Sequence, residues 1–287
     1  MSFHALRAQY ASLLKQFIAS TKEFEVLTSI PTDPSPPAET LYVLDSSFNP
    51  PTLAHLRIAS SALQERLQPT SRLLLLLATQ NADKPSKPAS FEDRLIMMEL
   101  FAHDLRSHLA TTATSTSSGH AHPTTHLPSI DIGVTKKPYF VDKAAAIEAA
   151  GTYPTPLEQV HLTGYDTLIR ILNPKYYPPE YNLQPLNVLF SRHRLRVRMR
   201  PDDEWGSPED QQEFVAALAR GDRENEGGRR EWAERIHLVP GKTPGEPPVS
   251  STKAREAVQA TSQDLDWLVP DRVRDFMRSE QPYSRDR

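Results

Sequence analysis

Hydrophobic positions follow two kinds of pattern along this chain. From residue 41 onward, short and nearly continuous apolar runs alternate with stretches in which apolar residues recur every three or four positions. The first pattern is typical of strands buried on both faces, and the second of amphipathic helices. We expect strands at 41–44, 72–78, 130–134, 160–163, 187–190 and 236–239, and helices at 52–67, 91–108, 141–150, 167–172 and 209–220.

The alternation of strands and helices predicts a doubly wound α/β domain, with a parallel sheet covered by helices on both faces. Residues 3–24 have helical spacing, and the proline-rich residues 31–37 follow as a stiff linker. We therefore place an N-terminal helix and linker in residues 1–38, and the α/β domain with its C-terminal helices in residues 39–287. Ligands of such sheets bind at the carboxyl ends of the strands, so the residues after each strand are the candidates for chemistry.

Two polar segments interrupt the alternation. Residues 111–126 have low sequence complexity, and we expect a disordered insertion at about 110–127, although His120, His122 and His126 could bind a metal ion. The charged residues 221–234 are expected to form a surface connection. We predict no metal site held by the protein's own side chains.

Arginine occupies every second position from Arg192 to Arg200. In an extended strand this spacing places all these guanidinium groups on one face. Such a row could bind polyphosphate or RNA, but we expect an edge segment whose charged face is simply solvated.

The overall charge and composition exclude several functions. The 287 residues include 33 Lys and Arg against 36 Asp and Glu, and a net charge of −3 argues against a dedicated binder of nucleic acid or anionic membranes. Cysteine is absent, which excludes thiol chemistry, and the longest apolar run, 73–78, is too short to span a membrane. We expect a protein of the cytoplasm, the nucleus or both, and leave oligomerisation open. Neither GxGxxG nor GxxxxGKS/T occurs.

The turn after the first expected strand has the features of an anion site. Residues 45–55 read DSSFNPPTLAH, and the tandem prolines favour a helix that begins at Pro50 or Pro51. Ser46 and Ser47 then lie in the strand-to-helix turn, where backbone amides and the helix dipole attract an anion.

Thr52 and His55 are three residues apart, so both project from one side of the first helical turn toward that anion. The His55 imidazole can donate to phosphate oxygens and, when protonated, adds positive charge as negative charge builds up in a transition state. In this setting we favour a functional histidine over a satisfied surface or core histidine.

A second phosphate site is predicted at residues 250–255, which read SSTKAR. Serine or threonine at a helix cap offers hydroxyl groups and free backbone amides. Arg255 lies on the same face as Thr252 and supplies a planar guanidinium for phosphate oxygens. The alternative is an ordinary capped helix with a solvated Lys/Arg face.

Together these two motifs resemble those of one family. SxFNPxTxxH after the first strand and SSTKxR near the C terminus are similar to motifs of the nicotinamide/nicotinate mononucleotide adenylyltransferases, within the nucleotidyltransferase superfamily. LTGYD at 162–166, LFSR at 189–192 and WLVPDRVRDF at 267–276 resemble further segments of that family. The resemblance implies a Rossmann-like fold and transfer of AMP from ATP, bound with Mg²⁺, to nicotinamide or nicotinate mononucleotide. The products would be NAD or deamido-NAD and pyrophosphate.

The resemblance also implies roles for individual residues. His55 and Arg255 would be catalytic. ATP contacts are assigned to Ser46, Ser47, Thr52, His55, Gly164, Asp166, Arg192, Thr252, Lys253 and Arg255. Mononucleotide contacts are assigned to Phe48, Asn49, Tyr139, Tyr177 and the alternatives Lys84 and Lys87, between which the spacing does not decide.

The chain departs from the family pattern at two places. Ser46 stands where the first motif normally has glycine, and Pro247 and Pro248 replace an asparagine before the second motif. Two other functions therefore stay open. One is nucleotidyl transfer to a different phosphorylated acceptor, and the other is a nucleotide-binding regulatory protein or weak ATPase that has lost transfer activity.

Overall fold

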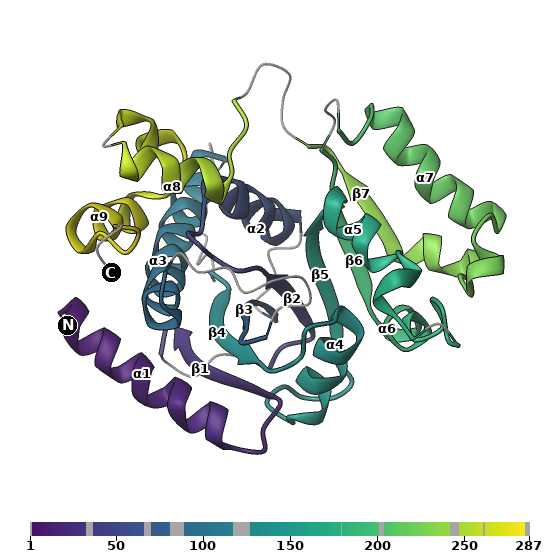
Figure 1. Ribbon diagram of the computed structural model, residues 1–287, viewed down its shortest axis with the longest axis horizontal. Helices are drawn as coiled ribbons and strands as arrows, with labels where there is room; N and C mark the ends of the chain where they lie inside the picture. Colours follow the sequence, from purple (N-terminus) through teal and green to yellow (C-terminus); the bar gives the residue numbers. More distant parts are fainter. Residues whose placement is uncertain are drawn as a thin grey trace.

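The computed structural model describes residues 2–32, 37–65, 70–80, 89–116, 127–178, 180–200, 204–241, 247–260 and 262–284. Within these residues a seven-stranded sheet runs in the order β1-β4-β3-β2-β5-β6-β7, with helices on both sides (Figure 1). All neighbouring strands are parallel except β1, which pairs antiparallel with β4. The predicted doubly wound α/β fold with terminal helices is therefore confirmed.

The elements have the following bounds. The strands are β1 (Phe24–Ile30), β2 (Thr40–Asp45), β3 (Ser71–Ala78), β4 (Ser129–Thr135), β5 (Glu158–Gly164), β6 (Arg194–Arg198) and β7 (Ile236–Val239). The α-helices are α1 (Phe3–Ala19), α2 (Leu53–Glu65), α3 (Phe91–Thr116), α4 (Phe140–Ala149), α5 (Tyr165–Ile171), α6 (Leu186–Arg192), α7 (Pro208–Arg220), α8 (Ser251–Gln259) and α9 (Asp271–Glu280). Short 3-10 helices are η1 (Pro174–Tyr176), η2 (Glu224–Glu226), η3 (Arg230–Arg235) and η4 (Gln263–Trp267).

The strand order reverses at β2. From β2 the chain adds β3 and β4 on one side, then returns to add β5, β6 and β7 on the other. The carboxyl ends of β2 and β5 therefore diverge into connections on opposite sides, which is the point where doubly wound sheets bind ligands. β2 ends at Asp45 and β5 ends at Gly164, so the site is expected beside these two residues.

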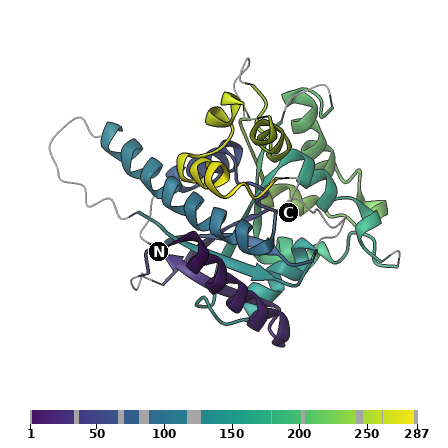
Figure 2. The ribbon, with the colours of Figure 1, turned by 60° about the vertical axis from the view of Figure 1, so that its left-hand side comes forward.

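Alternating side chains of the central strands pack in two layers. Leu73, Leu75 and Leu77 of β3 share one hydrophobic cluster with α1, α2, α3, α8 and α9, whereas Leu74 and Leu76 face α4. A third cluster joins α4, α5, α6 and η3 to β6. The views in Figures 1 and 2 show the C-terminal helices lying beside α3. The central strands are thus buried on both faces, as their continuous apolar runs predict.

The N-terminal segment contains a strand that the sequence analysis did not predict. α1 ends at Ala19, and residues 24–30 form β1 at the sheet edge instead of a continued helix or linker. Ser20 ends the helix by capping the carbonyls of Gln16 and Phe17. Part of the predicted linker, 33–36, lies outside the described residues.

The expected strand at 187–190 is wrong, because these residues belong to α6. Leu186, Leu189 and Phe190 are buried at helical spacing, whereas Val188 is 59% exposed. Within residues 187–190 only Leu189 and Phe190 face the core, and the strand follows at 194–198.

The arginine row is also corrected. Only its middle part is extended, and β6 lies between β5 and β7 rather than at an edge. Arg196 is 5% exposed and donates to Glu65 of α2, with Nε 3.0 Å from Oε2. Arg194 pairs with Glu158. The middle of the row is therefore paired with acidic side chains, whereas Arg192 and Arg200 at its ends are exposed.

Both polar segments are more ordered than expected where they are described. Residues 111–116 continue α3, while 117–126, with His120, His122 and His126, lie outside the described residues. Residues 221–234 include η2 and part of η3, and Trp232 is 2% exposed and stacks on Phe190 at 5.2 Å. Among the described residues, no helix is long and apolar enough to cross a membrane.

Candidate active site

The phosphate turn, residues 46–52, joins β2 to α2 at the carboxyl edge of the sheet. The helix begins at Leu53, slightly later than predicted, because Pro50, Pro51 and Thr52 complete the turn. Phe48 adopts a φ of 45° and is fully buried, with its ring 6.5 Å from that of Phe101. This buried ring anchors the turn to the core beneath it.

The side chains of Phe48 and Asn49 are buried in the turn, at 0% and 1% exposure, and support its shape. Their contact with the mononucleotide stays a prediction. Ser47, by contrast, is exposed, and Ser46 is half-buried. These serines present the polar surface that the sequence analysis placed beside the anion.

His55 projects from the first turn of α2 toward the phosphate turn. Its Nδ1 accepts the backbone N–H of Thr52 at 3.0 Å, so we assign the proton of the neutral ring to Nε2. Nε2 then donates to the Ser46 hydroxyl at 3.0 Å. Burial lowers the pKa of His55 to about 4, so the ring is neutral at neutral pH and Nε2 can donate a hydrogen bond without carrying charge.

The second motif packs directly against the first. Ser250 caps α8 by accepting the N–H of Lys253, and Ser251 Oγ donates to the carbonyl of Pro50 at 2.8 Å. Arg255 donates from Nη1 to the carbonyl of Asn49 at 2.8 Å, and from Nη2 to Thr252 Oγ1 at 3.1 Å. Segments 201 to 206 residues apart thus build one site.

Helix α8 points its N-terminal turn at this edge, with Thr252 and Lys253 exposed. Free amides at a helix N-terminus, a lysine and an arginine form a combination suited to phosphate groups. Together with the phosphate turn, they can hold a chain of phosphates between two helix N-termini.

A pocket of about 390 Å³ adjoins the start of the phosphate turn. Its walls include Ser46, Ser47, Tyr139 and Tyr177, so both tyrosines predicted for the pyridine ring lie in it. The hydroxyl of Tyr177 donates to the carbonyl of Ile171 at 2.8 Å, which fixes its ring. An aromatic ligand ring can therefore stack at this position.

Sequence analysis missed cations close to the turn. Lys143 of α4 is 5% exposed, lines the pocket and forms an ion pair with Asp45 at the end of β2. Arg170 of α5 also lines the pocket. Arg94 of α3 is 3% exposed and donates to the carbonyl of Ser47 at 3.3 Å. Lysine and arginine on amphipathic helices normally indicate a solvated face, so only the tertiary structure reveals these three.

The other residues predicted to contact ATP or the mononucleotide lie in different parts of the chain. Gly164 and Asp166 lie where β5 meets α5, at the same sheet edge as Asp45. A Cβ on Gly164 would stand 2.7 Å from Asp166 Oδ1, so the glycine permits this close approach. Lys84 and Lys87 lie outside the described residues.

Arg192 does not lie with this group. It precedes β6 and therefore sits at the amino ends of the parallel strands, opposite the site, with its side chain 69% exposed and near Glu148. The predicted role in the nucleotide cleft is thus corrected. A strand was expected at 187–190, but these residues belong to α6, whose last residue is Arg192.

The fold and the contact between the two motifs are compatible with a nucleotidyltransferase, and the comparisons with known proteins show that class. Residues 43–257 match the cytidylyltransferase-like family, a range that runs from β2 into α8 and contains both motifs. A Schizosaccharomyces pombe protein named "Putative nicotinamide mononucleotide adenylyltransferase" is 33% identical over 276 residues, which covers 96% of this chain and 97% of that protein. The chain therefore belongs to the cytidylyltransferase-like family and, within it, to the nicotinamide/nicotinate mononucleotide adenylyltransferases.

Solved structures with a similar arrangement were also found. Plasmodium falciparum nicotinic acid mononucleotide adenylyltransferase, complexed in one structure with NaAD and in another with APC, aligns with 85% of this chain. In both cases 97% of that protein is covered, at 11% identity and a TM-score of 0.46.

Proposed function

We propose that the protein transfers AMP from ATP to nicotinamide or nicotinate mononucleotide, forming NAD or deamido-NAD and releasing pyrophosphate. The observation that carries the proposal is the contact between the two motifs. Arg255 and Ser251 of α8 bond to the carbonyls of Asn49 and Pro50, next to a pocket lined by Tyr139 and Tyr177. This arrangement supports adjoining sites for a triphosphate and an aromatic acceptor.

The reaction needs positioning more than acid–base chemistry. An oxygen of the mononucleotide 5′-phosphate attacks the α-phosphorus of ATP, and the bond to the bridging oxygen of pyrophosphate breaks. The second pKa of a phosphate monoester is about 6, so the attacking group is already largely dianionic at neutral pH. Catalysis then consists of aligning the three atoms and stabilising the charge that develops.

We assign the donors on this basis. The Thr52 amide at Nδ1 orients the His55 ring, and an oxygen of the α-phosphate replaces the Ser46 hydroxyl as the acceptor of the Nε2–H. Arg255, Lys253 and the N-terminal turn of α8 hold the β- and γ-phosphates, which become the leaving pyrophosphate. No covalent intermediate with the protein is required.

Magnesium would be held mainly by the substrate. The described residues include no group of three or more His, Asp or Glu side chains that could bind a metal ion by themselves. Mg²⁺ commonly keeps water ligands and binds substrate phosphates, so it would not need a set of protein side chains of its own. The ion would supply further charge neutralisation on the phosphates.

The acceptor pocket favours a planar ring over other phosphorylated acceptors. Two tyrosine rings suit stacking, which a flexible chain such as phosphopantetheine would not use. We therefore propose ATP and a pyridine mononucleotide as the substrates.

A product assay tests the proposal. The protein is incubated with MgATP and, separately, nicotinamide mononucleotide, nicotinate mononucleotide or phosphopantetheine, and dinucleotide and pyrophosphate are quantified. We expect product with a pyridine mononucleotide. ATP binding without dinucleotide formation would instead support a regulatory protein, and product with phosphopantetheine would support a different transferase.

A further inference from the structure

The phosphate turn is held in place by residues far away in the sequence. Besides the bonds from Ser251 and Arg255, the first amide of α2, that of Leu53, donates to the carbonyl of Leu268 at 2.9 Å. Tyr283 adds a further bond near the end of the described chain. Its hydroxyl donates to Asn49 Oδ1 at 3.1 Å, across a separation of 234 residues.

Tyr283 and Arg255 hold two oxygens of the same residue. Arg255 bonds to the Asn49 carbonyl, while Tyr283 bonds to the Asn49 side chain. The side chains of Tyr283 and Asn49 are almost completely excluded from solvent, at 4% and 1% exposure. Because the amide oxygen is buried, the bond from the Tyr283 hydroxyl contributes to where the Asn49 side chain lies.

The backbone around Tyr283 is fixed in its turn. Gln259 of α8 donates to the Tyr283 carbonyl at 3.3 Å. Gln281 ends α9 with a φ of 46°, which turns the chain back toward α8. Burial also raises the pKa of Tyr283, so its hydroxyl stays protonated and keeps its role as a donor.

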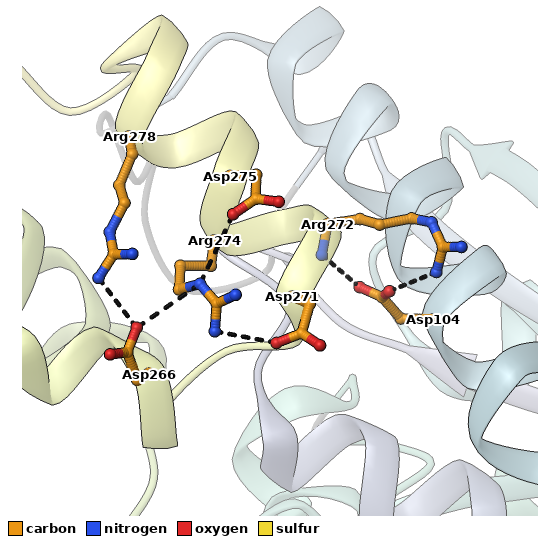
Figure 3. A network of polar contacts seen from close by, with 7 residues as sticks. All are labelled: Asp104, Asp266, Asp271, Arg272, Arg274, Asp275 and Arg278. Carbon is orange, nitrogen blue, oxygen red and sulfur yellow. Dashed lines mark hydrogen bonds and ion pairs between the residues drawn. The ribbon is translucent and has the colours of Figure 1, made fainter. Parts of the chain in front are cut away.

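Helix α9 carries this segment and is itself clamped at its start (Figure 3). Asp104 of α3 accepts the backbone N–H of Arg272 at 3.0 Å and its Nη1 at 2.8 Å. Asp266 of η4 pairs with Arg274 and Arg278, at 3.5 and 2.9 Å. The position of Tyr283 is therefore set by the packing of α9 on α3 and η4.

We propose that Tyr283 is a positioning residue of the active site. Its hydroxyl holds the side chain of Asn49, whose carbonyl accepts a bond from Arg255. The phosphate turn and the Arg255 guanidinium thereby keep fixed positions relative to each other when ATP binds. The effect on turnover rests on the proposed adenylyl transfer, whereas the effect on ATP affinity does not.

The test compares Tyr283→Phe with Tyr153→Phe. Tyr153 also donates from a buried hydroxyl, to Asp131 at 2.8 Å, but it packs with Phe24 on the α4 side of the sheet and makes no contact with the phosphate turn. Both variants keep the ring and lose one buried hydrogen bond. Calorimetry gives the Kd for ATP, steady-state kinetics give kcat and KM, and thermal unfolding gives Tm.

We expect Tyr283→Phe to raise the Kd for ATP roughly tenfold and to lower kcat by a similar factor, with the mononucleotide KM within about twofold of wild type. Tyr153→Phe should lower Tm at least as much and leave Kd and kcat unchanged. The inference would be overturned if Tyr283→Phe had the same Kd and kcat as wild type. It would also be overturned if Tyr283→Phe and Tyr153→Phe lost ATP affinity and turnover equally.

A double-mutant cycle with Arg255→Ala separates positioning from an independent effect. If Tyr283 acts through Asn49 on Arg255, the double variant should bind ATP no more weakly than Arg255→Ala alone. Additive losses would overturn the proposed route. A wild type that binds ATP without forming dinucleotide would refute the proposed function, while the ATP affinities would still decide the role of Tyr283.

Discussion

His161 of β5 offers a quantitative test of how this fold depends on pH. The side chain is 1% exposed, and neither ring nitrogen has a hydrogen-bond partner in the part of the chain that the structure describes. Burial, assisted by His193 and Lys143, lowers the pKa of His161 to about 3, and burial lowers that of His55 to about 4. In the unfolded chain both rings return to an ordinary value of about 6.5.

The sign and size of the effect follow from proton uptake. Below pH 6.5 the unfolded chain binds protons that the folded protein does not, so the free energy of unfolding falls as the pH falls. At pH 5, which is about 1.5 units below the unfolded pKa, each buried imidazole lowers the free energy of unfolding by about 2 kcal/mol. One pKa unit corresponds to about 1.36 kcal/mol. Together the two rings lower the free energy of unfolding by about 4 kcal/mol between pH 7 and pH 5.

Two other groups modify this value. Burial also lowers the pKa of His193, which acts in the same direction. Burial raises the pKa of Asp104, which acts in the opposite direction because the folded protein then binds its proton more readily. The dominant loss still occurs between about pH 6.5 and 4, below the range where the native fold is most stable.

Urea unfolding at pH 7, 6 and 5 and constant ionic strength measures the effect. His161→Leu removes one titrating ring, so we expect the loss between pH 7 and 5 to shrink by about 2 kcal/mol. His237 is exposed on β7, and His237→Leu serves as the matched control, since it replaces a histidine without removing a buried ring. A wild-type loss below about 1 kcal/mol, or the same loss in His161→Leu, would refute the reasoning.

Three further predictions concern the site and its support. His55→Ala should fold normally but lose about two to three orders of magnitude in kcat for dinucleotide formation, because one preorganised donor is removed; unchanged turnover would exclude His55 from the mechanism. Arg255→Ala should raise the KM for ATP by roughly 10- to 100-fold, since a charged donor is lost, and unaltered ATP and pyrophosphate kinetics would contradict the second phosphate site. Asp104→Ala should lower the free energy of unfolding by about 1–2 kcal/mol in urea titrations, because the N-terminus of α9 loses its carboxylate partner. Arg272→Ala should lower it by less than about 1 kcal/mol, since the Arg272 side chain is half exposed.

The sheet could be predicted from the sequence because its strands are buried on both faces. Continuous runs such as 72–78 leave few alternatives to a central parallel strand. The strand at 24–30 escaped prediction because its pairing with β4 is a long-range contact with no local signature. The prediction for 187–190 failed for a different reason, since a run of three apolar residues, 188–190, fits a strand and a helix equally well.

The candidate site was predictable where a motif fixes the backbone. Serines before tandem prolines, and serines at the start of a helix, create turns and caps by local chemistry alone, and the structure brings both together at His55 and Arg255. Their contacts with ATP stay predictions. Lys143, Arg94 and Tyr283 were missed because each reaches the turn from a distant helix or tail, and nothing in its local sequence distinguishes it from a surface or core residue.

The long separation between the phosphate turn and its supports affects the order in which the protein folds. Strands β2, β3 and β4 lie close in the chain and can pair early, whereas the bonds to Asn49 and Pro50 close loops of more than 200 residues. Contacts with such separations form slowly, because the entropy of loop closure must be overcome before the contact contributes. Catalytic competence should therefore appear in refolding experiments after the sheet's far-ultraviolet signal, and that lag would be the kinetic signature of a site completed from the far end of the chain.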